Sequence, residues 1–353
     1  MMTKSISNKA GRFSVLVLAL LVAFVIMPAV GYGAQKAHKE MKLTLASYIP
    51  VGYPYIYEGQ QLFVDMVNKN GKGIVQLEAY WGGTLLDGKQ LLPGLQAGTA
   101  DIIFQTGAYL LGSYPVIGVQ MLPVWKGPSD SHKGLKMDAP LANLQNDIAK
   151  EKNLYQLAVA GVIPEFLWTG KKLVRTPEDM KGLKIRVAGK VEAKVIQALG
   201  AAPVTMPSAE LPQALQRGVV DGALINPWTA SGRGTEEFCK YMTAYPFAFQ
   251  STPIYVLWDK WNSWPADVRK VLADTAREWE PKYAAEEGAL ITDAQLERDV
   301  VPLYEKKGMK TILLNENEEE AFDKATEPVI DWWVEQVGED VGKKALKYTT
   351  KYR

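Results

Sequence analysis

The sequence predicts an α/β protein built from two units of one plan, and two observations indicate this. Residues 41–83 follow the order strand, helix, strand, which is typical of α/β domains with a mainly parallel sheet. The segments LQAGTADIIF (95–104) and LQRGVVDGAL (215–224) match at Leu, Gln, Gly and Asp, 120 residues apart. Each predicts a helix that ends at a glycine and turns into a buried strand. The duplication suggests two lobes, although coincidence in so common a unit also explains a ten-residue match.

The N-terminus has the pattern of an export signal. Three basic residues precede an apolar run from residue 13 to about 30, and Gly33 and Ala34 follow it. A basic segment, an apolar segment and small residues in that order predict a secretory signal peptide, here residues 1–33. The alternative is an uncleaved membrane anchor, because the run approaches the length that spans a bilayer.

The first elements after this segment follow from residue periodicity. Residues 41–50 alternate like a strand and stop at Pro50. Residues 58–70 have helical spacing of apolar side chains and close at Gly71, and residues 73–83 predict a second strand.

The C-terminal third is predicted to be mostly helical. Residues 265–308 have helical character, with bends expected at Pro281 and Pro302. Residues 309–314 predict a short strand, and residues 318–338 predict one last amphipathic helix. Because the chain contains no linker rich in Gly, Ser or Pro, we expect ordered crossings between the lobes and domain boundaries that are discontinuous in sequence.

Composition narrows the class of protein. The 353 residues are 47% hydrophobic and 22% charged, which is typical of a globular protein long enough for two domains. With 40 basic and 39 acidic residues, the net charge of +1 gives no electrostatic reason to expect a nucleic-acid partner. The single cysteine, Cys239, cannot form an internal disulfide and is expected to be a small buried hydrophobe.

The usual signatures of catalysis are missing together. The chain has two histidines, no nucleophile-elbow pattern, no His/Cys pair with metal-ligand spacing and no glycine-rich phosphate loop. We therefore expect no catalytic residues, no metal and no cofactor.

One buried charge points to a binding site. In KGLKIRVAGK (181–190), apolar residues predict a buried strand that has Arg186 in its middle. A buried guanidinium needs a partner. That partner is either a carboxylate of the chain, with Glu210 and Asp221 as candidates, or a molecule that is not part of the chain.

With these residues in view, the chain resembles the solute-binding proteins of TRAP (tripartite ATP-independent periplasmic) transporters for organic acids. The resemblance is most specific in RTPEDMKGLKIRV (175–187) and ALGAAPVTMPSAELPQALQRGVVDGALINP (198–227), and GGTLLDGKQLLPGLQAGTADI (82–102) also fits. It implies a two-lobed periplasmic-binding-protein fold with hinge strands and long C-terminal helices. Lobe I would comprise residues 34–163 plus about 251–290, and lobe II residues 164–250 plus about 291–353, with the ligand between them.

The resemblance also implies which residues meet the ligand. Arg186 corresponds to the arginine that binds the ligand carboxylate, for which a planar fork of donors is well suited. Asn226 would offer its amide to the same carboxylate or to a nearby hydroxyl, although it also suits a turn before a proline. Four further candidates follow from the positions where relatives contact the solute or where aromatic side chains end strands: Tyr48, Gln105, Trp228 and Gln250.

The sequence departs from the family at one position. Many members carry a second arginine about twenty residues before the first, where this chain has Phe166, flanked by Glu165 and Trp168. The departure favours a monocarboxylate, with an apolar or aromatic body as a further hypothesis. Glu165 would receive an ammonium group on the ligand or point to solvent. Elsewhere, Glu210 is expected in the first turn of a helix capped by Ser208, and Asp221 is expected to have a structural role like that of Asp101.

The expected function is capture of a small organic acid in the periplasm by a monomeric protein, followed by docking on the membrane subunits of a TRAP permease. Two rivals remain open. One is an exported lyase or isomerase with Arg186 as anchor and Glu165 or Glu210 as acid–base group. The other is a binding protein that presents its solute to a sensory receptor.

Overall fold

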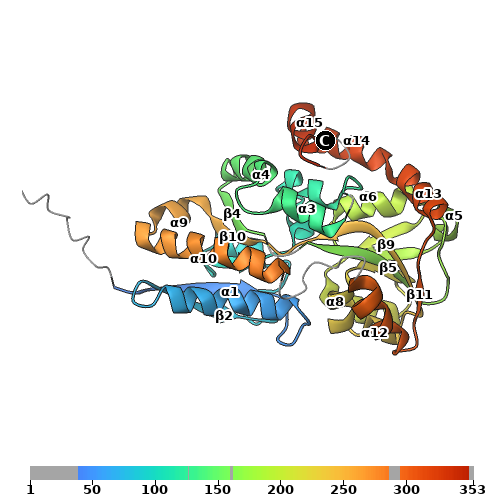
Figure 1. Cartoon of the computed structure of the whole chain (residues 1–353), viewed down its shortest axis with the longest axis horizontal. Coiled ribbons are helices and arrows are strands. Elements are labelled where there is room, and N and C mark those ends of the chain that lie inside the picture. Colours follow the sequence, from blue (N-terminus) through green and yellow to red (C-terminus); the bar gives the residue numbers. More distant parts are fainter. Residues whose placement is uncertain (1–38, 126, 160–161, 286–294, 350–353) are drawn as a thin grey trace, which may run out of the picture. The chain divides into compact units, whose positions relative to one another are not determined.

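A computed structural model describes residues 39–125, 127–159, 162–285 and 295–349, and Figure 1 shows their arrangement. The expected signal peptide at residues 1–33 lies outside the described residues. Within the described ranges, no helix combines the length and the apolar character needed to cross a membrane.

The first sheet has five strands in the order β2-β1-β3-β10-β4. β1 lies between β2 and β3 and pairs in parallel with both, while β10 runs antiparallel to β3 and β4. Helix α1 (Ile56–Asn70) connects β1 to β2, which confirms the strand–helix–strand prediction. The strands are β1 (Met41–Ser47), β2 (Val75–Tyr80), β3 (Ile102–Phe104), β4 (Leu154–Ala158) and β10 (Ile254–Leu257).

The second sheet has six strands in the order β11-β9-β5-β8-β6-β7. β6 pairs in parallel with β7 and β8, whereas β5 runs antiparallel to β8 and β9. The predicted buried strand around Arg186 is β6, where Arg186 is 2% exposed. The strands are β5 (Ile163–Thr169), β6 (Lys184–Val187), β7 (Ala202–Thr205), β8 (Gly222–Ile225), β9 (Tyr241–Gln250) and β11 (Lys310–Ile312).

The duplicated segment forms the same structure in both sheets. In the first copy, Asp101 accepts a hydrogen bond from Thr44 N (2.8 Å) and donates its own N–H to Thr44 O (2.9 Å). In the second copy, Asp221 makes the same two bonds with Lys184, each at 2.8 Å. Helices α2 (Leu91–Gln96) and α7 (Leu211–Gln216) precede these aspartates, and the glycine after each helix has positive φ. The structural role predicted for Asp221 is therefore confirmed.

The remaining helices cover the sheets. Helix α10 packs on α1, and α14 packs on α6. In Figure 1, α10 is orange and α1 blue, while α14 is red and α6 yellow-green. The helices not yet given are α3 (Pro128–Leu135), α4 (Pro140–Lys150), α5 (Pro177–Met180), α6 (Lys190–Ala198), α8 (Pro227–Gly232), α9 (Trp258–Ser263), α10 (Ala266–Ala285), α12 (Val301–Glu305), α13 (Glu316–Thr326), α14 (Pro328–Val337) and α15 (Glu339–Leu346). Short 3-10 and π turns are η1 (Gly107–Leu110), η2 (Pro115–Met121), η3 (Ser208–Glu210), η4 (Thr235–Glu237) and η5 (Leu296–Val300).

Two expectations about helices need correction. The single helix predicted at 318–338 is two helices, because α14 begins at Pro328, whose ring cannot continue the hydrogen bonds of α13. Ser208 caps no helix through its side chain: its N–H donates to the Tyr109 hydroxyl, and its own hydroxyl accepts from Arg233. Pro281 lies inside α10 as expected, and Cys239 is buried.

Three connections carry the chain between the sheets, and two of them position the site. One joins β4 to β5, and the other joins β9 to β10 through residues 251–253. β5 and β9 pair with each other over most of their length, so the two connections leave the second sheet side by side.

Candidate functional site

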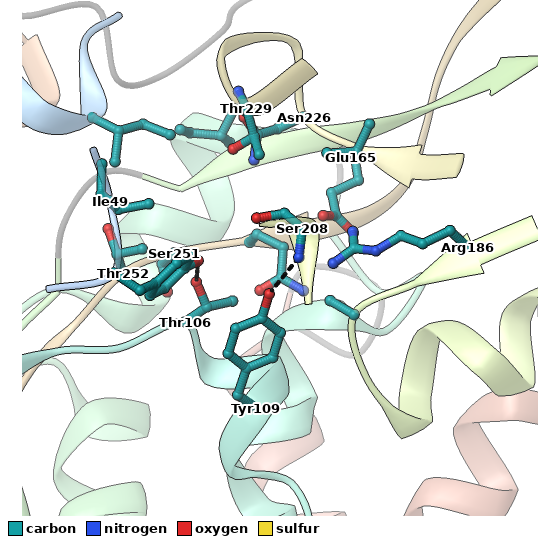
Figure 2. A pocket seen from close by; sticks show the side chains of 16 residues that line it. Ile49, Thr106, Tyr109, Glu165, Arg186, Ser208, Asn226, Thr229, Ser251 and Thr252 are labelled. Carbon is teal, nitrogen blue, oxygen red and sulfur yellow. Dashed lines mark hydrogen bonds between the residues drawn. The ribbon is translucent and has the colours of Figure 1, made fainter. Parts of the chain in front are cut away.

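A small cavity lies where the two sheets meet, and Arg186 lines it. Its volume, counted as space for the centres of water-sized groups, is about 30 Å³. Since one water needs about 10–15 Å³ by this measure, the cavity has room for only a few non-hydrogen atoms. Figure 2 shows its wall, which is formed by these residues: Tyr48, Ile49, Ile56, Thr106, Tyr109, Ile163, Glu165, Arg186, Ala188, Ser208, Ile225, Asn226, Thr229, Gln250, Ser251 and Thr252.

The guanidinium of Arg186 is held by backbone and keeps donors unused. Nε donates to Met206 O (3.0 Å) and Nη1 to Leu224 O (3.4 Å). Of the five N–H donors of an arginine, these bonds use two and leave three, including both on Nη2. Two parallel donors of this kind match the geometry of a carboxylate.

Neither in-chain partner expected for Arg186 fills that role. Glu210 is exposed and pairs with Lys89 at 2.9 Å, and Asp221 is committed to the start of β6. Among the described residues, no carboxylate forms an ion pair with Arg186.

Two buried carboxyl groups, Glu165 on β5 and Glu192 on α6, lie close enough to interact with Arg186 electrostatically. Figure 2 shows the Glu165 carboxyl directed toward the guanidinium. Burial raises the pKa of the Glu165 carboxyl well above its ordinary value, the Glu192 charge adds to the rise, and Arg186 opposes it. Burial also raises the pKa of Glu192, where Arg186 and three hydrogen bonds act in the opposite direction. We infer that Glu165 is the protonated member of the pair and donates a hydrogen bond to an ionised Glu192.

Glu192 is fixed from several sides. Its Oε2 accepts from Ala188 N (2.6 Å) and Gly189 N (2.9 Å), which closes the first turn of α6. Its Oε1 accepts from Gln250 Nε2. A carboxylate that accepts this many donors is stabilised in its charged form.

Asn226 caps a helix and also lines the cavity. Its Oδ1 accepts from Thr229 N at 2.8 Å and so caps α8. Because this bond fixes the orientation of the amide, Nδ2 is the group left to donate into the cavity.

Of the nine residues expected at the site, five line the cavity. These are Arg186, Asn226, Glu165, Tyr48 and Gln250. Tyr48 comes from the end of β1, where its hydroxyl hydrogen-bonds with Thr106 (2.5 Å).

The other four residues, Gln105, Phe166, Trp168 and Trp228, lie outside the cavity wall. Gln105 is buried and donates to Gly88 O (2.9 Å). Phe166 lies on the opposite face of β5 from Glu165, since neighbouring strand residues alternate, and belongs to the hydrophobic core that contains Leu211 and Met242.

Trp168 and Trp228 also belong to that core. Trp168 donates its indole N–H to Ile225 O (2.8 Å) and packs edge-on against Tyr304. Trp228 lies against the ring of Tyr55, with 4.3 Å between the ring centres. The aromatic wall that the sequence suggested therefore consists of Tyr48 and Tyr109 alone.

Several residues of the site escaped the sequence analysis. Tyr109, Thr106, Ser208 and Ser251 line the cavity, and Glu192 lies behind it. Only Glu192 had a usable local signal, because a glutamate in the first turn of a helix after Gly189 is typical of an N-terminal cap. In the described ranges, no group of three His, Cys, Asp or Glu side chains is placed to hold a metal ion.

Two mixed sheets with a polar cavity at the connections between them, and a buried arginine in its wall, define a class of protein that encloses a small ligand between two α/β units. The model of the bacterial extracellular solute-binding proteins, family 7, matches residues 47–336. The chain belongs to this family, and the resemblance to TRAP solute-binding proteins is confirmed.

Individual relatives agree with this. The C4-dicarboxylate-binding periplasmic protein of Rhodobacter capsulatus is 27% identical over 293 residues, which cover 80% of this chain and 83% of that protein. A TRAP periplasmic solute-binding protein of Rhodoferax ferrireducens, solved with bound malonate, has a TM-score of 0.77 at 21% identity, covering 87% of this chain and 98% of that one. One from Ralstonia eutropha, solved with bound (S)-2-acetolactate, has a TM-score of 0.76 at 22% identity over the same shares. These structures share the α/β fold of this chain.

Proposed function

We propose that the protein is an exported binding protein that captures a small monocarboxylate and delivers it to the membrane subunits of a TRAP permease. The observation that best supports this proposal is the state of Arg186, which is 2% exposed, lines the cavity and makes no ion pair within the described chain. A carboxylate of the ligand supplies the missing partner. The ligands named for the relatives above, malonate and acetolactate among them, are organic acids and support this assignment.

One carboxylate fits the charge of the site better than two. Of the described residues that line the cavity, Arg186 is the one with a cationic side chain, and Glu165 adds no second cation. A second ligand carboxylate would therefore lie in a buried site with no arginine to receive it, since Phe166 takes the place of the second arginine and faces the core.

The two sheets support the two lobes expected from the sequence. In the proposal, lobe I comprises residues 34–163 plus about 251–290, and lobe II residues 164–250 plus about 291–353. Residues 1–33 act as a signal peptide that delivers the chain to the periplasm as a monomer. The protein binds its ligand without converting it.

The test is ligand binding to the mature protein, measured by calorimetry against a panel of small mono- and dicarboxylates. Replacing Arg186 with Met should weaken binding of the tightest ligand by about 30- to several-thousand-fold, because removing one partner of a buried charge pair costs about 2–5 kcal/mol of binding free energy. Arg175→Met is the matched control, since Arg175 lies outside the cavity wall and forms a partly exposed ion pair with Glu318 of α13. Binding by Arg186→Met within threefold of the parent would overturn the proposal. Recovery of a chemically altered ligand would overturn the proposal that the protein binds its ligand without converting it.

A further inference from the structure

Among the described residues, two buried oxygen atoms of the cavity wall receive no hydrogen bond. They are Oε2 of Glu165 and Oε1 of Gln250, and their side chains are 2% and 5% exposed. Both residues line the cavity that Arg186 lines. Burying a polar atom without a partner costs about 1–3 kcal/mol, so two such atoms in one small cavity indicate that its occupant supplies donors.

The Gln250 oxygen can only accept a hydrogen bond. Gln250 Nε2 donates to Glu192, and this bond fixes which end of the amide faces the carboxylate. Exchanging the amide nitrogen and oxygen would place an oxygen against the ionised carboxylate, which is unfavourable. Oε1 of Gln250 is therefore held as a carbonyl acceptor.

The Glu165 oxygen is an acceptor for a similar reason. Glu165 hydrogen-bonds with Glu192 as the donor of the pair, so its proton lies on the Glu192 side. Oε2 is then the carbonyl-type oxygen of a neutral carboxyl group. A bulge in the pairing of β5 with β9 between Glu165 and Leu167 accompanies this placement.

The two acceptors are neighbours. Across the β5–β9 pair, Ile163 lies opposite Gln250, and Glu165 lies opposite Ala248, two residues along each strand. Gln250 contributes a side-chain hydrogen bond that lowers the pKa of the Glu165 carboxyl, and the charge of Arg186 lowers it as well. A ligand whose carboxylate lies on Arg186 therefore has its adjoining atoms beside both acceptors.

We propose that Glu165 and Gln250 form a second subsite, which receives a hydrogen-bond donor carried by the ligand next to its carboxylate. This rests on the proposed function and narrows the ligand class to small monocarboxylates that carry a hydroxyl or an ammonium group. A 2-oxo acid or an unsubstituted acid offers no donor and leaves both oxygens unpaired.

The test compares four three-carbon acids on the mature protein by calorimetry: lactate, alanine, pyruvate and propanoate. Lactate, alanine or both should bind about 10- to 1000-fold more tightly than propanoate and pyruvate, because a site built around a hydrogen bond rejects an analogue that lacks it. Equal affinity for lactate and propanoate, or a preference for pyruvate, overturns the second subsite while leaving the proposed function intact. If none of the four binds and the wider carboxylate panel also fails, the proposed function fails instead.

Variants of Glu165 separate a specific role from a merely structural one. Glu165→Met removes both oxygens and should bring the ratio of lactate to propanoate affinity close to one, whatever happens to overall stability. Glu165→Gln retains an acceptor oxygen and an N–H for Glu192, so it should restore part of the ratio for lactate.

Glu178→Gln is the matched control, since Glu178 lies in α5, is exposed and forms an ion pair with Lys181, the residue that ends this helix. It should leave the ratio unchanged. A ratio in Glu165→Met equal to that of the parent overturns the proposal, because a role in stability alone would change both affinities together.

Discussion

Glu280 should make the stability of this protein fall as pH rises through neutrality. The residue lies on α10, is 5% exposed and accepts hydrogen bonds from Met137 N (2.9 and 3.0 Å) and Val159 N (3.0 Å). Burial raises the pKa of its carboxyl from 4.5 to about 7, and the two backbone donors oppose the rise without cancelling it.

The sign follows from proton binding. Between pH 4.5 and 7 the folded protein holds a proton on Glu280 that the unfolded chain has lost, so the folded state is favoured at the acidic end. This contribution is complete below the unfolded pKa and is lost as pH rises through the folded pKa. A rise of the pKa from 4.5 to about 7 corresponds to about 3 kcal/mol, of which about 2–3 kcal/mol is lost between pH 5 and pH 8.

Urea unfolding of the parent and of Glu280→Gln at pH 5, 6, 7 and 8 measures this directly. The amide cannot ionise, so the difference in unfolding free energy between the two proteins isolates the carboxyl from every other titrating group. The parent should lose stability relative to the variant by about 2–3 kcal/mol over this range. Glu278→Gln is the control, because Glu278 is an exposed neighbour paired with Lys282 and should give a difference that hardly changes with pH. A difference independent of pH, or one that favours the parent at pH 8, would refute the reasoning, since it would mean that the two backbone donors outweigh burial.

Three further substitutions test the site and the second sheet. Asn226→Asp keeps a good helix cap but replaces the Nδ2 donor with an anionic oxygen, so calorimetry should show at least about tenfold weaker carboxylate binding with stability changed by less than about 0.5 kcal/mol. Gly222→Ala should destabilise the protein by about 2 kcal/mol or more in urea, because a Cβ there would lie 2.1 Å from the Trp168 carbonyl oxygen, whereas Gly112→Ala has no neighbour within 4 Å and serves as the tolerated control. Trp168→Phe should cost about 1–3 kcal/mol by leaving the Ile225 carbonyl without its indole donor, and an unchanged unfolding midpoint would contradict this.

The duplicated helix–glycine–strand unit was predictable because its signals are local. A glycine after a short helix and an aspartate three residues later specify a turn whose geometry depends on few distant residues. In both copies the aspartate hydrogen-bonds to the backbone of a parallel neighbour strand, at Thr44 within β1 and at Lys184 at the start of β6. The buried strand of Arg186 was predictable for the same reason.

The composition of the cavity wall could be predicted only in part. Alternation along β5 means that Glu165 and Phe166 cannot both face the ligand, but residue periodicity does not say which one does. The pairing of Glu165 with Glu192 depends on how α6 packs against β9, the strand beside β5, and that contact joins residues far apart in sequence. Polar residues such as Ser251 and Tyr109 carry no signal that separates a binding role from a structural one.

The connection after β9 has a mechanical consequence. Gln250, Ser251 and Thr252 contribute to the cavity wall, and they also begin the segment on which the chain passes from one sheet to the other. A rotation of one sheet against the other would turn about such segments, so displacement is smallest there and grows toward the outer strands β2 and β7. The proposed ligand site thus lies close to the axis of such a rotation. Spectroscopic labels on the outer strands would report its arrival with far greater amplitude than labels beside the cavity.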